Sequence, residues 1–394
     1  MSSNVWIAGV GMIPFKKPGQ SMSYLDMGAA AIRLALEDAG IDLDEVNQAY
    51  AGYVYGDSTS GQRALYEVGM TGMPVINVNN NCSSGSTALY LARQAIMGGA
   101  ADCVLAFGFE QMQPGAITTH WNDRPNTFQR FEDMANELES ANLPLALKYF
   151  GGAGREHMQR YGTPLSTFAE VRAKASRHAA NNPLAVFRDV VTADDVLASK
   201  ELWPGVLHKL MACPPTSGAA AALVVSDRFA KKMANTPMVR ILAQQLTTDF
   251  RSTFDSGSMI DLVGSKLTEA AAKSVYEQAG VGPQDVDVCE LHDCFAQNEV
   301  LSYEALGFCG EGEAARFVAD GDNTYGGQVV VNPSGGLLSK GHPLGATGLA
   351  QCYELTRQLR GTAGPTQVSG AEIGMQHNLG LGGAAVVTLF GKAA

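Results

Sequence analysis

A cysteine in a turn of small polar residues is the first feature of the sequence that could do covalent chemistry. The stretch NNNCSSGSTALYLARQAIMGG (residues 79–99) places Cys82 in the first turn of a predicted helix. Unpaired backbone N–H groups and the helix dipole stabilise a thiolate there, so we expect the pKa of Cys82 to lie below the ordinary thiol value of about 8.5. Cys82 is therefore a candidate nucleophile. The alternative is a small buried hydrophobic residue, the commonest role of a free cysteine.

A histidine occupies a comparable position later in the chain. The stretch KGHPLGATG holds His342 between Gly341 and Pro343, ahead of another predicted helix. Proline suits the first position of a helix, and glycine permits a strained backbone. A histidine placed in this way could face Cys82 and stabilise its thiolate, as in other cysteine–histidine pairs. A helix-capping or core histidine is the alternative.

Two further loops carry polar side chains of the same kinds. The stretch CELHDCFAQNE brings His292, Asp293 and Cys294 after a predicted buried strand. Its two soft donors could suggest a metal, but no second cluster supplies further ligands, so we expect none. The stretch MQHNLGLGGAAVV carries His377 and a glycine run that includes Gly380, whose bare backbone could approach a ligand closely.

These loops need a framework, and the sequence predicts an α/β fold with an internal repeat. Residues 5–10 are typical of a short buried strand, and residues 23–39 of an amphipathic helix that ends at Gly40. The segment LALEDAGIDLDEVNQAYAGY, from Leu34, aligns with SVYEQAGVGPQDVDVCELHD, from Ser274, at a constant offset of 240 residues. Both segments are predicted as helix, glycine stop, acidic loop and strand.

Later segments repeat in the same order. The strand, loop and helix around Cys82 are echoed by VVNPSGGLLSKGHPLGATGLAQCYELTRQLRG, and we match DCVLAFGFE to GAAVVTLF. We infer two similar α/β halves, residues 1–116 with 211–238 and residues 239–394, and a helix-rich insertion at residues 117–210. A duplicated sheet would bring equivalent loops face to face, at the strand ends where α/β proteins keep their sites.

The composition is that of a globular chain without a membrane span. Of the 394 residues, 46% are hydrophobic and 17% charged. No apolar stretch approaches the roughly 18–20 residues that a transmembrane helix needs, and we see no secretion signal. The seven cysteines are scattered singly, which predicts reduced thiols in a cytoplasmic protein. A net charge of −11 argues against broad nucleic-acid binding.

The insertion differs in charge from the rest of the chain. Residues 117–210 contain 11 Lys and Arg and 11 Asp and Glu, so the remaining residues carry the whole net charge of −11. The insertion is either a solvated helical surface with i,i+4 ion pairs or a platform for a phosphate-bearing ligand.

Four blocks of the sequence together resemble the active-site blocks of the thiolase superfamily. They are INVNNNCSSGSTAL, ELHDCFAQNE, YGGQVVVNPSGGLLSKGHPLGATGLAQ and QHNLGLGGAAVVTL. The chain is most similar to the sterol-carrier-protein-2 (SCP-x) type, in which a His-Asp-Cys-Phe block stands where ordinary thiolases have Asn-Glu-Ala-Phe. The likeness covers nearly the whole chain. It implies a layered α-β-α-β-α fold of two duplicated βαβαβαββ halves, with a loop domain at residues 117–210.

The resemblance also implies a reaction, the thiolytic cleavage of a 3-oxoacyl-CoA by CoA to acetyl-CoA or propionyl-CoA and a shortened acyl-CoA. Cys82 is expected to attack the 3-keto carbon and carry the acyl group, with His342 favouring its thiolate. Cys294 is expected to act as acid and base, and His292 with His342 to bind the thioester oxygen. The backbone N–H groups of Cys82 and of a glycine near Gly380 are expected to form an oxyanion hole.

The same resemblance implies that the insertion covers the site and binds coenzyme A, a co-substrate, with no separate cofactor. It also implies a homodimer or a dimer of dimers. The stretches MQPGAI and LPLALKYF could form the walls of an acyl-chain tunnel, and Ser217 stands where we expect an aspartate in the family. Two alternatives stay open. One is a thiolase-like aldolase acting on steroid side-chain CoA esters, which can lack the nucleophilic cysteine, and the other is a non-catalytic acyl-CoA or lipid carrier.

Overall fold

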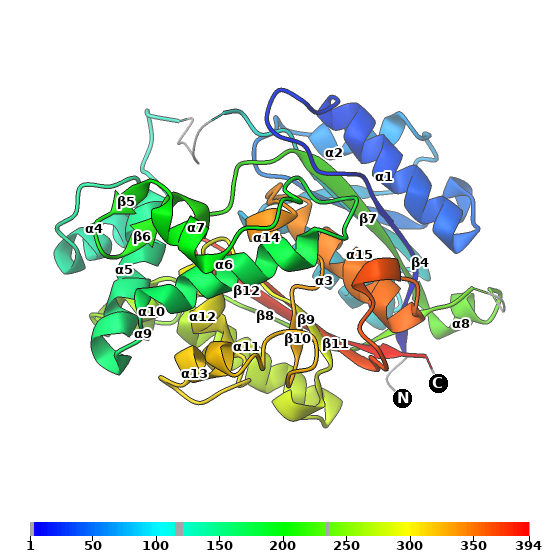
Figure 1. Cartoon of the computed structure of the whole chain (residues 1–394). Coiled ribbons are helices and arrows are strands. Elements are labelled where there is room, and N and C mark those ends of the chain that lie inside the picture. The colour runs from blue at the N-terminus through cyan, green and yellow to red at the C-terminus, as the bar shows by residue number, and fades with distance from the viewer. Residues whose placement is uncertain (1–3, 115–120, 234–235, 394) are drawn as a thin grey trace.

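Ten strands form one mixed sheet that runs through the molecule (Figure 1). The structure is a computed structural model, and it describes residues 4–114, 121–233 and 236–393. The strand order is β10-β9-β11-β12-β8-β1-β7-β4-β2-β3. One side of the sheet contains β1 (Val5–Met12), β2 (Gln48–Gly52), β3 (Val75–Val78), β4 (Cys103–Glu110) and β7 (Gly218–Ser226). The other contains β8 (Val239–Thr247), β9 (Val288–Glu290), β10 (Val330–Val331), β11 (Ile373–Gly380) and β12 (Ala384–Lys392).

The two sides of the sheet meet at a narrow seam between β1 and β8. These strands pair antiparallel through Trp6 with Arg240 and Ile7 with Val239. Outward from the seam the pattern is the same on both sides, with two antiparallel pairings (β1-β7-β4 and β8-β12-β11) followed by two parallel ones (β4-β2-β3 and β11-β9-β10). The predicted duplication of the α/β unit is therefore confirmed.

One predicted strand equivalence is wrong. The sequence comparison matched β4 with β12, but the sheet order matches β4 with β11 and β7 with β12. Both β4 and β11 lie parallel to the next strand outward, whereas β7 and β12 are antiparallel to both of their neighbours. All four strands are almost completely buried, so the hydrophobic pattern does not distinguish them.

The offset of 240 residues corresponds to a repeated helix, turn and strand. Helix α1 (Tyr24–Ala39) ends at Gly40, and α11 (Ser265–Ala279) ends at Gly280, with left-handed φ angles of 69° and 70°. A 3₁₀ turn follows each helix, η1 (Leu43–Glu45) and η3 (Pro283–Asp285), and then β2 and β9 begin at residues 48 and 288. Glycine suits both helix ends because other residues rarely adopt this conformation.

Helices and sheet form the five predicted layers. Helix α1 packs on β1 and β7, and α11 packs on β8 and β12. Helices α3 (Ser84–Met97) and α15 (Thr347–Arg360) contact each other and strands of both sides of the sheet, so they form the middle layer (Figure 1). Close packing there requires small residues, since a Cβ atom on Gly85 would lie 2.7 Å from the carbonyl oxygen of Gly345.

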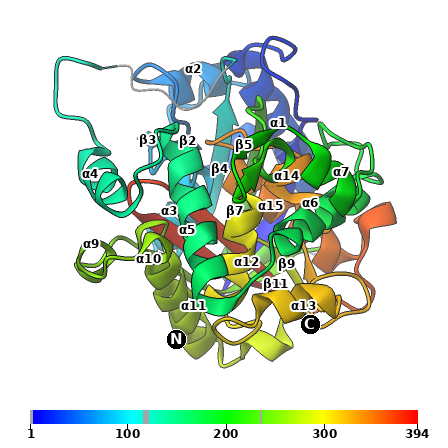
Figure 2. The same cartoon turned by 60° about the vertical axis from the view of Figure 1, so that its left-hand side comes forward.

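The insertion packs mainly on the second half of the chain, although it interrupts the first. It contains α4 (Gln129–Leu138), α5 (Leu145–Tyr161), α6 (Leu165–Ala179), α7 (Ala193–Ala198), β5 (Glu201–Trp203) and β6 (Leu207–His208). Helices α5 and α6 contact α12 (Ala296–Ala305), as Figure 2 shows. Buried Lys174 of α6 forms an ion pair with buried Glu299 of α12. The proposed boundary between residues 116 and 117 lies outside the described residues.

Short helices complete the fold: α2 (Ser60–Tyr66), α8 (Asp227–Ala230), α9 (Ser252–Asp255), α10 (Met259–Leu262), α13 (Ala314–Ala319), α14 (Gly336–Ser339), η2 (Lys209–Met211) and η4 (Gly364–Thr366). Within residues 4–114, 121–233 and 236–393, no helix has both the length and the apolar character needed to cross a membrane.

Candidate active site

Cys82 lies in a tight turn between β3 and α3. Helix α3 begins at Ser84 with Ser83 as its N-cap residue, so Cys82 precedes the helix and is not in its first turn as predicted. The turn is closed by backbone hydrogen bonds from the N–H groups of Ser83 and Ser84 to the preceding asparagines, and Asn81 adopts a left-handed φ of 50°. Gly380 of β11 packs on this turn, where a Cβ atom would lie 2.2 Å from a backbone oxygen.

The structure brings both predicted histidines to Cys82. The sulfur of Cys82 and one ring nitrogen each of His292 and His342 all lie within 4.8 Å of one another, and all three side chains are buried. The two imidazole rings are nearly perpendicular, with centroids 5.0 Å apart. His342 lies in the loop before α15 and Cys82 in the loop before α3, so the equivalent loops of the two halves meet at the site.

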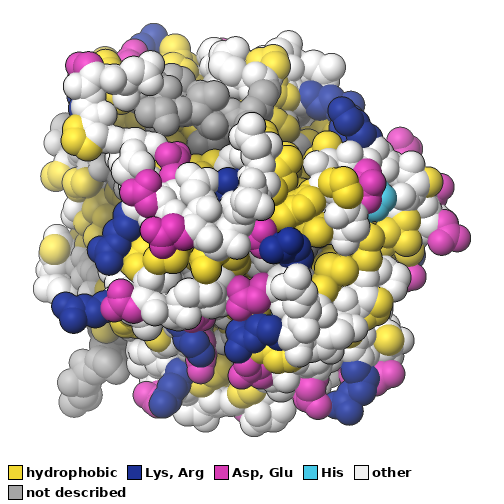
Figure 3. Space-filling model, turned by 90° about the vertical axis from the view of Figure 1, so that its left-hand side faces the viewer, with side chains coloured by type: hydrophobic (Ala, Val, Ile, Leu, Met, Phe, Trp, Pro, Cys, Tyr) yellow, Lys and Arg dark blue, Asp and Glu magenta, His cyan; other side chains and the backbone are white. Residues whose placement is uncertain are grey.

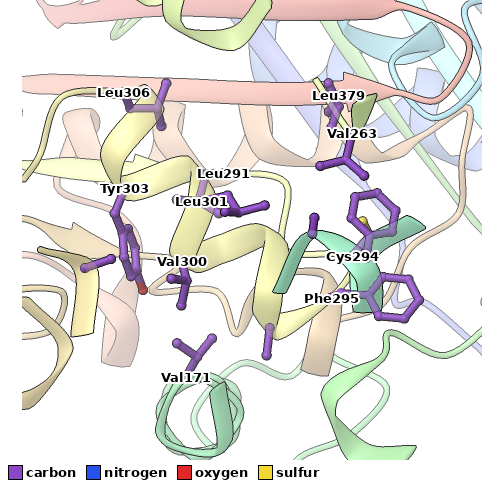
Figure 4. Close-up of a cluster of buried hydrophobic side chains, with 14 of the residues drawn as sticks. Val171, Val263, Leu291, Cys294, Phe295, Val300, Leu301, Tyr303, Leu306 and Leu379 are labelled. Carbon is purple, nitrogen blue, oxygen red and sulfur yellow. The ribbon is translucent and has the colours of Figure 1, made fainter. Parts of the chain in front are cut away.

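A cavity of about 540 Å³ opens from Cys82, and Cys294 lines it as predicted. A third cysteine, Cys213, also lines the cavity, and its backbone N–H donates to the carbonyl oxygen of Cys294 at 2.9 Å. Figure 4 shows Cys294 and Phe295 at one end of a buried hydrophobic cluster that continues along α12. Cys213 was not predicted as a site residue, because no motif surrounds it in the sequence.

The rest of the cavity is mostly apolar. Met112 lines it, and so do residues 144–147 and Phe150, as expected from the stretches MQPGAI and LPLALKYF. Residues 115–117 of the first stretch lie outside the described part of the chain. Glu132 is the one acidic side chain in the lining formed by the described residues. Hydrophobic side chains also show between the charged ones on the outer face that carries the insertion (Figure 3).

The structure does not bring His377 to the cavity. The ring of His377 forms a hydrogen bond with Thr268 of α11 at 3.0 Å, and His377 is absent from the cavity lining. Its neighbour Asn378 instead contacts the site, since Nδ2 of Asn378 lies 3.0 Å from Nδ1 of His292. Successive side chains of a strand point to opposite faces, and the sequence pattern does not reveal which face of this fully buried strand meets the site.

Burial, and then the negative charge of Glu110, raises the pKa of Cys82 from 9.0 to about 12. The backbone N–H groups of Cys82 and Leu381 point to the sulfur and lower this pKa. The predicted low pKa is therefore wrong. A rise of three pH units corresponds to about 4 kcal/mol, whereas interactions at a helix end contribute about 0.3–1 kcal/mol. Desolvation therefore outweighs them.

Both histidines are neutral at neutral pH. Burial lowers the pKa of His342 to about 3. Burial lowers the pKa of His292 well below its usual range, and the nearby His342 and His377 lower it further. Each ring therefore has one N–H group and one lone pair. Thr347 Oγ1 donates to the carbonyl oxygen of Pro343 at 3.0 Å, so it accepts from Nδ1–H of His342 at 2.7 Å, and the lone pair lies on Nε2.

Nε2 of His342 has no hydrogen-bond partner among the described residues, although it is buried. A basic nitrogen left open beside a thiol can accept the thiol proton when the sulfur attacks a substrate. The sulfur and the two rings could also in principle hold a soft metal ion. However, Asn378 donates to Nδ1 of His292, which places the proton on the other ring nitrogen. The arrangement therefore fits proton transfer better than metal binding.

Two buried carboxyl groups hold the loops in place. Asp293 accepts hydrogen bonds from the backbone N–H groups of Leu337 and Leu338 at 2.7 and 3.3 Å, which fixes the turn between His292 and Cys294. Burial, and then the charge of Glu299, raises the pKa of Asp293 to about 8.

Glu110, at the end of β4, accepts from the N–H groups of Val54, Tyr55 and Gly345 at 2.9–3.0 Å. It thereby ties the loop after β2 to the loop of His342. Nearby, Ser217 Oγ accepts from the N–H of Met112 at 3.0 Å, so the residue that departs from the expected aspartate still makes a loop contact.

Comparison with known proteins identifies the family of this chain. The family model "Thiolase, N-terminal domain" matches residues 5–200, and "Thiolase C-terminal domain-like" matches residues 251–392. Human sterol carrier protein 2 is 52% identical to this chain over 391 residues, which cover 98% of the chain and 71% of the relative. The chain belongs to the thiolase family. This thiolase is thus an enzyme of a family that uses CoA substrates.

Solved structures agree on the fold. An Ltp2-ChsH2(DUF35) aldolase superimposes on this thiolase with a TM-score of 0.83 at 23% identity, covering 99% of this chain and 98% of that one. Human mitochondrial 3-ketoacyl-CoA thiolase superimposes with a TM-score of 0.75 at 17% identity, covering 100% and 99%. At these identities the likeness concerns the fold alone.

Proposed function

We propose that this thiolase cleaves 3-oxoacyl-CoA thioesters with coenzyme A through an acyl group carried on Cys82. The observation that carries the proposal is the ring of His342 at the end of an apolar cavity: one of its nitrogens lies within 4.8 Å of the Cys82 sulfur, and its buried Nε2 has no hydrogen-bond partner among the described residues. A carrier protein needs a cavity, but it has no use for a base held next to a thiol.

In the first half-reaction the sulfur of Cys82 attacks the 3-keto carbon, and Nε2 of His342 takes the thiol proton. The C2–C3 bond then breaks, and its electron pair stays on C2 as the enolate of acetyl-CoA or propionyl-CoA. Cys294 gives its proton to C2. The acyl group remains on Cys82 as a thioester, and Cys294 is left as a thiolate.

In the second half-reaction coenzyme A enters in place of the first product. The Cys294 thiolate takes the proton of its thiol, and the CoA sulfur attacks the acyl carbonyl. Cys82 leaves and recovers its proton from His342. Oxygen atoms that become negative in these steps need hydrogen-bond donors, and removing one such donor typically costs about 2.7–4 kcal/mol of barrier. The N–H groups that point to the sulfur, those of Cys82 and Leu381, are the candidates.

The insertion is proposed to cover the cavity and bind the CoA moiety. Its helix α5 supplies one wall through residues 145–147 and Phe150, and its buried ion pair with α12 holds it on the second half of the fold. The apolar lining favours an acyl chain over a polar substrate.

A second copy of the chain is proposed as the partner at β3. This strand is the last in the sheet, and only β2 pairs with it among the described residues. Ile76 on β3 and Met97 at the end of α3 are 37% and 44% exposed. An uncovered apolar strand edge favours pairing with another strand. Light scattering should give about twice the 41.5 kDa of one chain, and Ile76→Lys should shift the protein toward monomer.

The function is tested by intact-protein mass spectrometry after rapid mixing with a series of 3-oxoacyl-CoAs. One acyl group should appear per chain in the wild type and in Cys352→Ala, a control that removes a buried cysteine outside the cavity. Cys82→Ala should gain no mass and should not turn over substrate. Turnover by Cys82→Ala would overturn the proposal and favour aldolase chemistry, whereas binding of acyl-CoA without any covalent product would favour a carrier.

A further inference from the structure

A buried chain of hydrogen bonds leads from a backbone carbonyl to the ring of His292. Gln376 Nε2 donates to the carbonyl oxygen of Gly348 and, at 3.0 Å, to Ser86 Oγ. Ser86 Oγ donates to Asn378 Oδ1 at 2.8 Å, and Asn378 Nδ2 lies 3.0 Å from Nδ1 of His292. The Ser86, Gln376 and Asn378 side chains are buried, and the chain joins α3 of the first half to β11 of the second.

The carbonyl group of Gly348, at the end away from His292, determines which group donates at each step of these hydrogen bonds. The carbonyl oxygen of Gly348 can only accept, so the amide group of Gln376 presents its nitrogen there, and its second proton is shared between Ser86 Oγ at 3.0 Å and Gln351 Oε1 at 3.3 Å. With that donor on its oxygen, the hydroxyl of Ser86 has one proton left to give, and Asn378 offers the acceptor. If the Asn378 amide were flipped, its NH₂ group would face Ser86 Oγ, and Ser86 would lose the acceptor that it has in Asn378 Oδ1.

The orientation of Asn378 then determines the state of His292. Because Asn378 presents an N–H group to Nδ1, this nitrogen must hold a lone pair, and the proton of the neutral ring lies on Nε2. His342 is held in the opposite tautomer, with its lone pair on Nε2, through Thr347. Two adjacent neutral imidazoles are thereby made different, one a donor and the other an acceptor.

We propose that Asn378 is a positioning residue that keeps His292 as a hydrogen-bond donor through Nε2–H, with its own orientation set by Ser86 and Gln376. The inference rests on the proposed function only for its kinetic consequence. In that reaction an N–H donor on His292 can stabilise the substrate oxygen that becomes negative, whereas a lone pair on the same nitrogen would repel this oxygen. The tautomer itself is a property of the protein without substrate.

Close packing against helix α15 holds this chain of hydrogen bonds in one geometry. A Cβ atom on Gly348 would lie 2.0 Å from Ser86 Oγ and 2.6 Å from Asn378 Oδ1. Helix α15 can therefore approach these hydrogen bonds closely only with glycine at position 348. Any side chain there would displace Ser86 Oγ and Asn378 Oδ1.

The test uses Asn378→Asp, which keeps the shape and removes the donor. A carboxylate accepts from Nδ1–H, so the neutral ring of His292 turns its lone pair to the substrate. We expect kcat to fall by about 100-fold at about pH 8, with KM little changed, as for the loss of one oxyanion donor. At lower pH the ring, now next to a carboxylate, takes up a second proton and has N–H groups on both nitrogens. The variant should therefore regain activity, to within about 10-fold of the wild type, as the pH falls.

Asn323→Asp is the matched control. It also places a carboxylate on a buried asparagine, but one that contacts Tyr303 and is absent from the cavity lining. Its kcat should follow the wild-type pH profile. A loss of activity in Asn378→Asp that is equal at every pH would mean a merely structural role and would overturn the proposal.

Nitrogen-15 NMR of the histidine rings gives a readout on the wild-type protein that needs no turnover. The chain has seven histidines, and His292→Asn assigns the signal. Wild-type protein should show a protonated Nε2 and an unprotonated Nδ1 at His292. A protonated Nδ1 and an unprotonated Nε2 would overturn the inference but not the proposed function. If the protein showed the predicted pattern but no thiolysis, the proposed function would be overturned and the inference on the tautomer would remain.

Discussion

Replacing Glu110 by glutamine should change the pH dependence of stability in a defined direction. Burial raises the pKa of Glu110 from 4.5 to about 7. Between these pH values the unfolded chain has an ionised carboxylate and the folded protein has the neutral acid, so folding takes up one proton. Stability that this group contributes at low pH is lost as the pH rises through the folded pKa. The free energy of unfolding should fall by about 1.4 kcal/mol per pH unit, or about 3 kcal/mol in all.

Glu110→Gln cannot titrate and should lack this slope. The amide oxygen still accepts hydrogen bonds, but its NH₂ group faces one of the three backbone N–H groups of Val54, Tyr55 and Gly345. This mismatch costs about 1–3 kcal/mol at every pH. Urea unfolding of both proteins at a series of pH values gives their difference in unfolding free energy. The unfolding free energy of the wild type minus that of the variant should fall by about 3 kcal/mol between about pH 4.5 and pH 8, so a wild-type advantage of about 1–3 kcal/mol at low pH disappears or reverses at high pH. A difference that stays constant over this interval would refute the assignment of a buried, titrating carboxyl group.

Other substitutions probe the remaining parts of the site. Cys294→Ala should lower thiolysis by about 10²–10⁴-fold, the usual contribution of a general acid–base group, while iodoacetamide still alkylates Cys82; unchanged turnover would remove Cys294 from the mechanism. Lys174→Met leaves Glu299 buried without its partner and should cost about 3–5 kcal/mol of unfolding free energy; a smaller loss would mean that the ion pair does not anchor the insertion. Ala146→Phe fills part of the cavity and should reduce kcat/KM for long acyl chains but not for short ones across a substrate series; an equal loss for both would place the acyl chain elsewhere.

Much of the fold could be predicted from the sequence because the chain repeats itself. The glycine stops at Gly40 and Gly280 and the common offset of 240 residues gave the two α/β units, and the units placed the loops of Cys82 and His342 opposite each other. The match of β4 with β12 failed for a physical reason. Strands buried on both faces carry no alternation, so only the pairing directions reveal which are equivalent.

The site itself could be predicted in part. Cys82, His292, Cys294 and His342 all line the cavity, as their loops indicated. Cys213 could not be found, because no motif surrounds it and its place in the cavity lining, next to Cys294, depends on the folded chain. Asn378 was missed in favour of His377, since the side that each occupies depends on the register of β11. The sign of the thiol pKa shift was missed because burial is a property of the folded chain.

The raised pKa of Cys82 changes how the nucleophile must work. An enzyme that stored a thiolate in this cavity would hold a charge that burial opposes by about 4 kcal/mol. A neutral thiol beside a neutral His342 avoids that cost, and the proton then moves only as the carbon–sulfur bond forms. The negative charge appears on the substrate oxygen and not on the sulfur, so the donors must be aimed at that oxygen before the reaction begins. This requirement explains why a chain of buried side chains as long as the one from Gln376 to His292 is needed to fix a single ring proton.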